Sequence, residues 1–233
     1  MSQIKVEYIN HCGDDLSVVD AARCSFDKQS DWEYHTEYSA FSTGEIKGLK
    51  SADEKLIKYL ANHKHYSPFN HSFISVRVKA PVFVARQLVK HKFMPWNEVS
   101  RRYVKGEVEF YSPEYWRKSA ENVKQGSSQV DANPPSLWMF DDWKDDINSH
   151  HEEAFNYYEH LLAQGVCAEQ ARQVLPQSMM TTWIWSGTLG AFCDMLVLRL
   201  DEHTQYETRV VAQQVSEIVK ELFPVSYKAL VEK

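Results

Sequence analysis

Residues 72–91 change from strand-type to helix-type hydrophobic spacing at Pro81. The segment SFISVRVKA alternates apolar and polar side chains, which predicts a strand with one buried face. Proline suits the first turn of a helix, and PVFVARQLVKH continues with the apolar spacing of an amphipathic helix. The chain is therefore expected to combine a sheet with helices.

The remaining segments extend this mixed pattern without a linker or an internal repeat. IKVEYI alternates like a strand, SADEKLIKYLAN has helical spacing with Ser51 as a candidate cap ahead of Glu54, and EVEFYSP is typical of a strand. Residues 27–50 are polar and irregular, and residues 119–137 are the best candidate for a loop insertion. We expect one domain over residues 1–233, mostly helical beyond the insertion. Further helices are expected at residues 14–26, 138–163, 166–174, 189–200 and 206–223.

The balance of charges and the apolar runs exclude several classes of protein. With 26 basic and 32 acidic side chains the net charge is −6, which argues against a protein that coats nucleic acid but leaves room for a small anionic ligand. No apolar run approaches the roughly 20 residues that span a bilayer, and MSQIKVEYIN does not have the pattern of a signal peptide. We expect a cytoplasmic protein, or one of the host cytoplasm if the chain is viral.

The four cysteines are far apart and form no CxxC pair. This spacing indicates neither a disulfide framework nor a structural zinc site. Each cysteine is expected to be a buried, reduced thiol. The cysteines are Cys12, Cys24, Cys167 and Cys193.

The segment LVKHKFMPWNEVSRRY, residues 88–103, concentrates hydrogen-bonding side chains directly after an apolar run. It is expected to be the end of a helix that runs into a loop, since Pro95 helps to end the helix. Cations on facing segments can converge on a phosphate, but they can also form a solvated basic face balanced by Glu98. Both interpretations stay open on residue types alone. The cations are Arg86, Lys90, His91, Lys92, Arg101 and Arg102.

Two histidine-containing groups have ordinary structural explanations. His63 and His65 stand at alternate positions of an extended segment, which is compatible with metal ligation, but their spacing is not diagnostic. We predict no metal site and keep an unrelated metal enzyme only as a distant alternative. Ser100 with His91 as its base lacks the surroundings of a catalytic triad, so a hydrogen-bonding serine is expected instead.

The segment LVLRLDEHTQYETR ends an apolar helix abruptly in charged residues. Arg199 and His203 stand four positions apart, so they share one face if the helix continues. The alternatives are a functional cluster and an ordinary polar helix end. Acidic and amide residues stand beside them, namely Asp201, Glu202, Gln205 and Glu207.

Taken in order, HYSPFNH, APVFVARQLVKHKFMPWNEVSRRY, ARQVLP and LRLDEHTQYE resemble the flavin-dependent thymidylate synthases, the ThyX family. The resemblance extends from LSVVDAARCSF through VAQQVSEIVKELF and so covers most of the chain. The family signature, R-H-R followed after seven residues by S, stands here as Lys90, His91, Lys92 and Ser100. Both arginines have become lysines, which keeps the charge but loses the planar fork. Asn97, Glu98, Arg102 and Tyr103 match the rest of the longer pattern.

The resemblance implies an α/β (α+β) subunit with a central sheet flanked by helices, assembled into a homotetramer whose FAD sites form between subunits. It implies an enzyme, a methyltransferase that makes dTMP from dUMP. 5,10-Methylenetetrahydrofolate would supply the one-carbon unit, and NADPH would reduce the flavin. Since the cofactor does the hard chemistry, the protein is expected to position and polarise the substrates rather than to attack the uracil.

The resemblance also implies roles for individual residues. Lys90, Arg102 and Arg172 are expected to hold the nucleotide phosphate and base, and Arg199 the uracil edge, where a fixed cation would stabilise developing charge. Arg199, His91 and Ser100 are the implied catalytic group, with Ser100 as a hydrogen-bonding partner and His91 able to move protons near neutral pH. The implied dUMP-binding residues are Gln87, Lys90, Glu98, Ser100, Arg102, Arg172 and Arg199. The implied FAD-binding residues are His65, Ser67, His91, Lys92, Asn97, Thr188, Asp194 and His203.

Several positions depart from the family pattern. Asn70 stands where the family often has glutamate, and Thr188, Gly190 and Asp194 replace asparagine, arginine and asparagine contacts to flavin. These changes leave two alternatives open beside thymidylate synthesis. One is an enzyme that makes another 5-substituted pyrimidine nucleotide, for example from dCMP. A keto group accepts a hydrogen bond where an amino group donates one, so a few side-chain substitutions in the site could change which pyrimidine ring it recognises. The other is a catalytically silent, nucleotide-binding relative.

Overall fold

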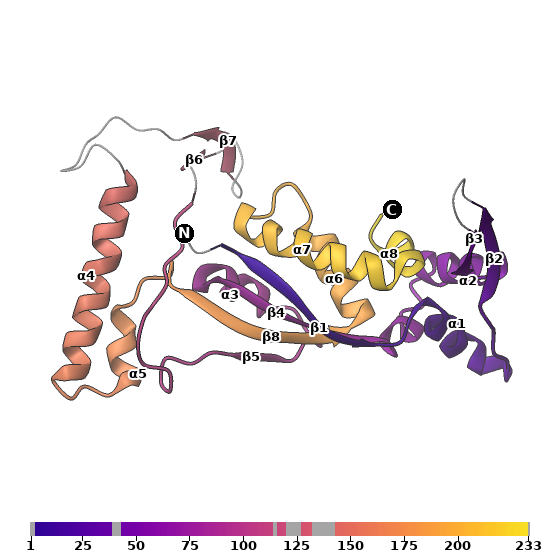
Figure 1. Cartoon of the computed structure of the whole chain (residues 1–233), viewed down its shortest axis with the longest axis horizontal. Helices are drawn as coiled ribbons and strands as arrows, with labels where there is room; N and C mark the ends of the chain where they lie inside the picture. Colours follow the sequence, from indigo (N-terminus) through magenta and orange to yellow (C-terminus); the bar gives the residue numbers. More distant parts are fainter. Residues whose placement is uncertain (1–2, 39–42, 114–115, 120–126, 132–142, 233) are drawn as a thin grey trace.

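A four-stranded antiparallel sheet lies at the centre of the computed structural model, which describes residues 3–38, 43–113, 116–119, 127–131 and 143–232 (Figure 1). The strand order is β1, β4, β8 and β5, and each neighbouring pair runs antiparallel. The four strands are β1 (Lys5–Cys12), β4 (Phe73–Pro81), β5 (Trp96–Glu98) and β8 (Met180–Thr188). The mixture of strands and helices that the sequence predicts is confirmed.

Alternation along the two middle strands gives the sheet one apolar face. Val76 of β4 stands opposite Trp185 of β8, and Val78 stands opposite Trp183; all four side chains are buried. Helices α6 (Leu189–Arg199), α7 (Tyr206–Leu222) and α8 (Pro224–Leu230) lie over one side of this sheet and share its hydrophobic core (Figure 1). The core therefore sits between the sheet and these helices. The remaining helical segments are α1 (Asp15–Arg23), η1 (Cys24–Phe26), α2 (Ser51–Asn62), η2 (Ser67–Asn70), α3 (Val82–Leu88), α4 (Trp143–Ala163), α5 (Ala168–Ala171) and η3 (Arg172–Val174).

The change of spacing at Pro81 corresponds to a real boundary, but Pro81 belongs to the strand. It is the last residue of β4 and pairs with Met180, and α3 begins at Val82. A proline has no N–H to donate, so it is tolerated at the end of a strand. Helix α3 ends at Leu88, and the polar stretch beyond it contains β5 as well as loops.

The described chain beyond residue 137 is mostly helical, as predicted, but strand β8 within it was not predicted. Met180–Thr188 alternates buried and more exposed positions and pairs with both β4 and β5. Thr188 then caps α6 by accepting a hydrogen bond from the Ala191 N–H at 3.2 Å, so strand and helix join without a loop.

Two other segments differ from their predicted structure. Residues 27–50, expected to be irregular, contain a hairpin of β2 (Glu33–Tyr38) and β3 (Thr43–Gly48). Residues 107–113, expected to be a strand, make only the isolated bridge between Phe110 and Met179. Backbone pairing to a partner strand, which local spacing does not reveal, decides both outcomes.

The predicted insertion at 119–137 is only partly described. Ser119 ends β6 (Arg117–Ser119), which pairs with β7 (Ser127–Asp131), so the described portion is a short hairpin rather than a loop. Residues 120–126 and 132–137, with residues 138–142 of a predicted helix, lie outside the described residues. Helix α4 lies beyond α5, near the end of the sheet where β8 begins (Figure 1).

Two smaller predictions are wrong. Ser51 is the first residue of α2 rather than its cap, because Lys50 holds that position with extended backbone. Three of the four cysteines, Cys12, Cys24 and Cys167, are exposed, and only Cys193 is buried, although all four are free thiols.

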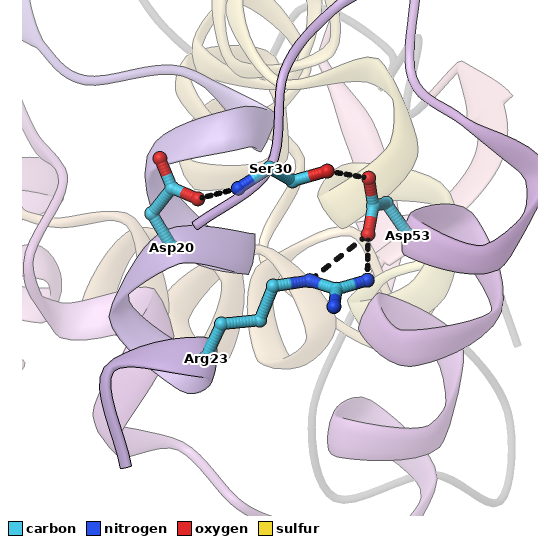
Figure 2. A network of polar contacts seen from close by, with 4 residues as sticks. All are labelled: Asp20, Arg23, Ser30 and Asp53. Carbon is cyan, nitrogen blue, oxygen red and sulfur yellow. Dashed lines mark hydrogen bonds and ion pairs between the residues drawn. The ribbon is translucent and has the colours of Figure 1, made fainter. Parts of the chain in front are cut away.

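A buried carboxylate joins α1 to α2 (Figure 2). Asp53, in the first turn of α2 and fully buried, forms an ion pair with Arg23 at the end of α1. Its other oxygen accepts a hydrogen bond from the Ser30 hydroxyl, and the Ser30 N–H donates to Asp20 at 2.8 Å. This network fixes the start of the segment that leads into the β2–β3 hairpin.

Candidate active site

The main cavity lies where the C-terminal ends of α3 and α6 meet the first turn of α7 and the β6–β7 hairpin. Its volume is about 740 Å³. Three of the predicted nucleotide-binding residues, Gln87, Lys90 and Arg199, line it together with His203. The other lining residues are Arg117, Ser127, Val197, Leu198, Asp201, Thr204, Gln205, Tyr206 and Glu207.

Arg199 and His91 are in direct contact beside this cavity. The Nε atom of Arg199 donates a hydrogen bond to Nε2 of His91 at 3.0 Å. Burial and the adjacent Arg199 cation lower the pKa of His91 to about 4, and burial lowers the pKa of Arg199 from its usual value. His91 is therefore neutral near pH 7 in this arrangement, and its implied role in moving protons stays a prediction that this lowered pKa does not favour.

Gln87 is held from the opposite helix. Thr208, buried in α7, donates from its hydroxyl to Oε1 of Gln87 at 2.8 Å. This bond fixes the orientation of the Gln87 carboxamide at the cavity wall. It also ties α3 to α7, so the two helices that carry cavity residues are connected beside the cavity.

A buried carboxylate forms part of the cavity wall. Glu207, in the first turn of α7, accepts a hydrogen bond from Arg117 at 2.6 Å and one from the Tyr111 hydroxyl at 3.4 Å. Burial, and then the Glu207 charge, raise the pKa of Tyr111, so its hydroxyl is a neutral donor. The sequence pattern indicated Glu207 only as a residue near Arg199. It did not indicate Arg117 as a site residue, because the partner of Arg117 is ninety residues away.

Four predicted nucleotide-binding residues do not line the main cavity of the described chain. Glu98 on β5 accepts hydrogen bonds from Thr181 at 2.8 Å and from the Trp96 indole at 3.0 Å. Ser100 accepts from the backbone N–H of Arg102 at 3.3 Å and from its side chain at 3.4 Å. The fourth, at η3, is Arg172. Three of the seven implied dUMP-binding residues therefore line the main cavity, and four lie outside its lining.

The cations of residues 86–102 have different roles. Lys90 lines the cavity, whereas Arg101 donates to the carbonyl oxygens of Gly106 and Glu107 and holds a loop. Glu98 pairs with Thr181 and Trp96 rather than with these cations. The segment is therefore not a simple solvated face balanced by Glu98.

The implied flavin residues are spread over several elements. His203 lines the main cavity and bonds Asp201 at 2.9 Å, and Asn97 lies on β5 opposite Ile184. His65 and Lys92 are exposed, Thr188 caps the start of α6, and Asp194 lies in the middle of that helix. The described chain does not bring these residues to one place. Ser67 begins η2.

Three of the positions that depart from the family pattern, Asn70, Thr188 and Gly190, lie next to one another. Thr188 donates from its hydroxyl to Oδ1 of Asn70 at 2.7 Å. The same Asn70 oxygen would lie 2.5 Å from a Cβ atom on Gly190, so a side chain at position 190 requires Asn70 to move. These three departures are therefore structurally linked, and they leave no room for an arginine at position 190 in this arrangement.

The histidines considered as metal ligands do not form a ligand cluster. His63 stacks on Tyr59 with ring centroids 4.0 Å apart, and its ring centroid lies 6.2 Å from that of His65. Within the described part of the chain, His, Cys, Asp and Glu form no group of three or more suited to a metal ion. The same described residues include no helix that is long and apolar enough to cross a membrane.

The antiparallel sheet and its helices define a single-domain α+β protein, with a cavity at the helix ends that is lined by both basic and acidic side chains. A family model described as "Thymidylate synthase complementing protein" matches residues 7–225. Flavin-dependent thymidylate synthases from Thermus thermophilus and Kosmotoga olearia are 35% identical over 227 residues and 36% identical over 232 residues. These alignments cover 97% and 96% of this chain, and 75% and 88% of the relatives. The chain belongs to the flavin-dependent thymidylate synthase family.

Solved structures show the same fold. The UMP/dUMP methylase PolB from Streptomyces cacaoi, bound with 5-Br UMP, superposes with a TM-score of 0.79 at 27% identity and covers 100% of this chain and 95% of its own. PolB bound with 5-Br dUMP superposes with a TM-score of 0.74, covering 98% and 95%. The α+β fold with a central sheet is therefore shared with methylases of pyrimidine nucleotides.

Proposed function

We propose that this protein is an FAD-dependent thymidylate synthase that methylates dUMP to dTMP, with 5,10-methylenetetrahydrofolate as carbon donor and NADPH as reductant. The observation that carries this proposal is the arrangement of Gln87, Lys90 and Arg199 at one cavity, beside His91. The resemblance implies Gln87, Lys90 and Arg199 as nucleotide-binding residues, and Lys90 and His91 belong to the family signature. PolB, a structural neighbour, binds 5-Br UMP and 5-Br dUMP in its solved structures, which supports a pyrimidine nucleotide as the ligand.

The cavity suits an anionic nucleotide. Lys90 and Arg199 supply positive charge, and an ammonium or guanidinium group binds phosphate or polarises a carbonyl. Arg199 is already oriented by His91, so it can stabilise charge that develops on a pyrimidine ring without first reorganising. Gln87, fixed by Thr208, would contribute an oriented amide.

The family implies a bound flavin, and the donor set of the main cavity fits a phosphate-bearing cofactor. His203, Thr204 and Lys90 offer hydrogen-bond donors or positive charge along one wall. When bound, the flavin would supply the hydride that turns the transferred carbon unit into a methyl group. At the start of α6, Asn70 and Thr188 would offer an amide and a hydroxyl where the family often offers a glutamate and an asparagine.

We further propose a homotetramer in which a neighbouring subunit completes each site. Glu98, Ser100, Arg102 and Arg172 lie outside the main cavity of one chain, so a second copy would have to bring them to the nucleotide. Apolar side chains close to them in sequence are exposed: Phe93 is 84% and Tyr103 is 76% accessible. Exposed aromatic rings of this size are typical of surfaces that another chain covers. The enzyme would act in the cytoplasm, on small molecules rather than on nucleic acid.

Product analysis tests the proposed function. The purified chain is incubated with FAD, NADPH, 5,10-methylenetetrahydrofolate and either dUMP, UMP or dCMP, and nucleotide products are identified by mass. We expect dTMP from dUMP. A methylated product only from UMP or dCMP would favour the alternative of another 5-substituted pyrimidine nucleotide. The structure of PolB bound with 5-Br UMP makes UMP a specific candidate substrate. Nucleotide binding without any product would indicate a catalytically silent relative.

A further inference from the structure

Glu207 carries a carboxylate into the wall of the main cavity where water is largely excluded. Its side chain is 9% exposed, and that of its partner Arg117 is 15% exposed. An isolated charge at such a position costs several kcal/mol, so the Arg117 guanidinium has a large effect on the local potential.

Arg117 makes more than one contact. Its Nε atom donates to the Ser127 hydroxyl at 2.8 Å, and its guanidinium lies 4.6 Å from the centre of the Tyr206 ring. Arg117 thereby joins β6, β7 and the start of α7. Arg117, Ser127 and Tyr206 line the main cavity together with Glu207.

The same pair also separates two cavities. A second cavity of about 300 Å³, lined mainly by aromatic and apolar residues, shares Arg117, Ser127 and Glu207 with the main cavity. The ion pair therefore forms part of the wall between a cationic space and a largely apolar one. A change of charge in this wall acts across a medium of low dielectric constant, where charges interact strongly.

We propose that Arg117 and Glu207 are a positioning pair: Arg117 cancels the buried charge of Glu207 and thereby keeps the main cavity attractive to an anionic nucleotide. This inference rests on the proposed function for the identity of the anion. It assigns Arg117 no contact with the nucleotide. Removing the arginine alone would leave a carboxylate facing an anion, whereas removing both charges would restore a neutral wall.

The test uses the full chain with Arg117→Met, Glu207→Gln and the double variant. dUMP affinity is measured by calorimetry at low and high salt. We expect Arg117→Met to weaken binding about tenfold or more, less so at high salt, because one uncompensated charge in a partly buried wall acts over several ångströms. Glu207→Gln should bind as tightly as the wild type or more tightly, and the double variant should return to within about threefold of the wild type.

Two results would overturn the proposal. If Glu207→Gln weakens dUMP binding as much as Arg117→Met does, the pair acts only through structure. If the double variant binds as weakly as Arg117→Met, then Arg117 contacts the nucleotide itself. Should Arg117→Met fail to fold, Glu207→Gln still decides, because tight binding supports the proposal and weak binding contradicts it.

Thermal unfolding of the same proteins needs no ligand. Arg117→Met should lower the melting temperature by about 6 °C or more, and the double variant should recover most of this loss. No recovery would contradict charge cancellation. A wild-type protein that does not bind dUMP would overturn the proposed function, while this unfolding cycle would still decide whether the two charges cancel.

Discussion

The Nε atom of Arg199 donates a hydrogen bond to Nε2 of His91 across 3.0 Å, joining the end of α6 to the segment that follows α3. The bond uses the Nε2 lone pair, so His91 carries its ring proton on Nδ1. Two residues far apart in the sequence thus fix each other's orientation beside the main cavity.

His91 should titrate with a pKa of about 4, which NMR of its ring protons measures. Burial is the larger cause and the Arg199 charge the smaller, so Arg199→Met should raise this pKa while leaving it below 6.5. A wild-type ring that titrates at 6.5 would contradict the contact.

The same shift gives a pH dependence of stability. The folded pKa lies below the unfolded value of 6.5, so the contribution is fully present above pH 6.5 and is lost as the pH falls from 6.5 towards 4. Urea unfolding at pH 7 and pH 5 should show this loss. His91→Gln should reduce the difference between the two pH values, and an unchanged difference would assign it to other groups.

Arg199→Ala should remove most turnover of dUMP and leave the fold intact. A preoriented cation at a developing charge is worth about 100-fold or more in kcat. Steady-state rates with circular dichroism as the fold check measure this effect. Arg86→Ala, at an exposed arginine of α3, is the matched control and should keep near-normal rates; equal rates for both variants would refute the role of Arg199.

Lys90→Arg restores the residue that the family signature has at this cavity position. The charge is kept and a planar fork is gained, so the dissociation constant for dUMP should stay the same or fall. Titration calorimetry measures it. A large loss of affinity would show that the cavity is shaped around lysine.

Asn70 and Gly190 should show coupled stability. Gly to Ala inside a helix normally stabilises by about 1 kcal/mol, but here the new Cβ atom would force Asn70 away from Thr188. We expect little or no gain from Gly190→Ala alone and a gain of about 1 kcal/mol in an Asn70→Ala background, measured by chemical unfolding. Equal effects in both backgrounds would show that the two positions are independent.

Asp53→Asn should destabilise the protein by about 2–4 kcal/mol, because it removes a buried charge that Arg23 needs as a partner. Chemical unfolding measures the difference. Glu54→Gln, in the same turn of α2, is the control and should change stability by only about 0.5 kcal/mol. A loss of similar size in both variants would mean that the network in Figure 2 contributes little.

Local spacing predicted the elements whose burial pattern is regular. The helix predicted at residues 206–223 is α7, with Val211, Val215 and Val219 on its buried side, and the predicted alternation of β4 is confirmed as well. Strand β8 was missed because MTTWIWSGT runs into the apolar helix LGAFCDMLVLRL without a turn signal, and its two neighbouring strands hold it extended.

In the candidate site, too, some residues could be predicted from the sequence and others could not. The family resemblance predicted Gln87, Lys90 and Arg199 as nucleotide-binding residues, and the fold brings them to one cavity. Arg117 gave no signal, because its role depends on Glu207, a contact between distant parts of the chain. Ion pairs of this kind follow from tertiary packing rather than from local residue patterns.

The visible absorption spectrum of the purified protein, recorded before and after adding FAD and then dUMP, tests the central claim most directly. The account predicts a bound-flavin spectrum after desalting that changes when dUMP is added, because nucleotide and flavin would share one site. A protein that stays colourless after incubation with FAD and desalting would contradict it and would show that the residues at Asn70, Thr188, Gly190 and Asp194 do not support flavin binding.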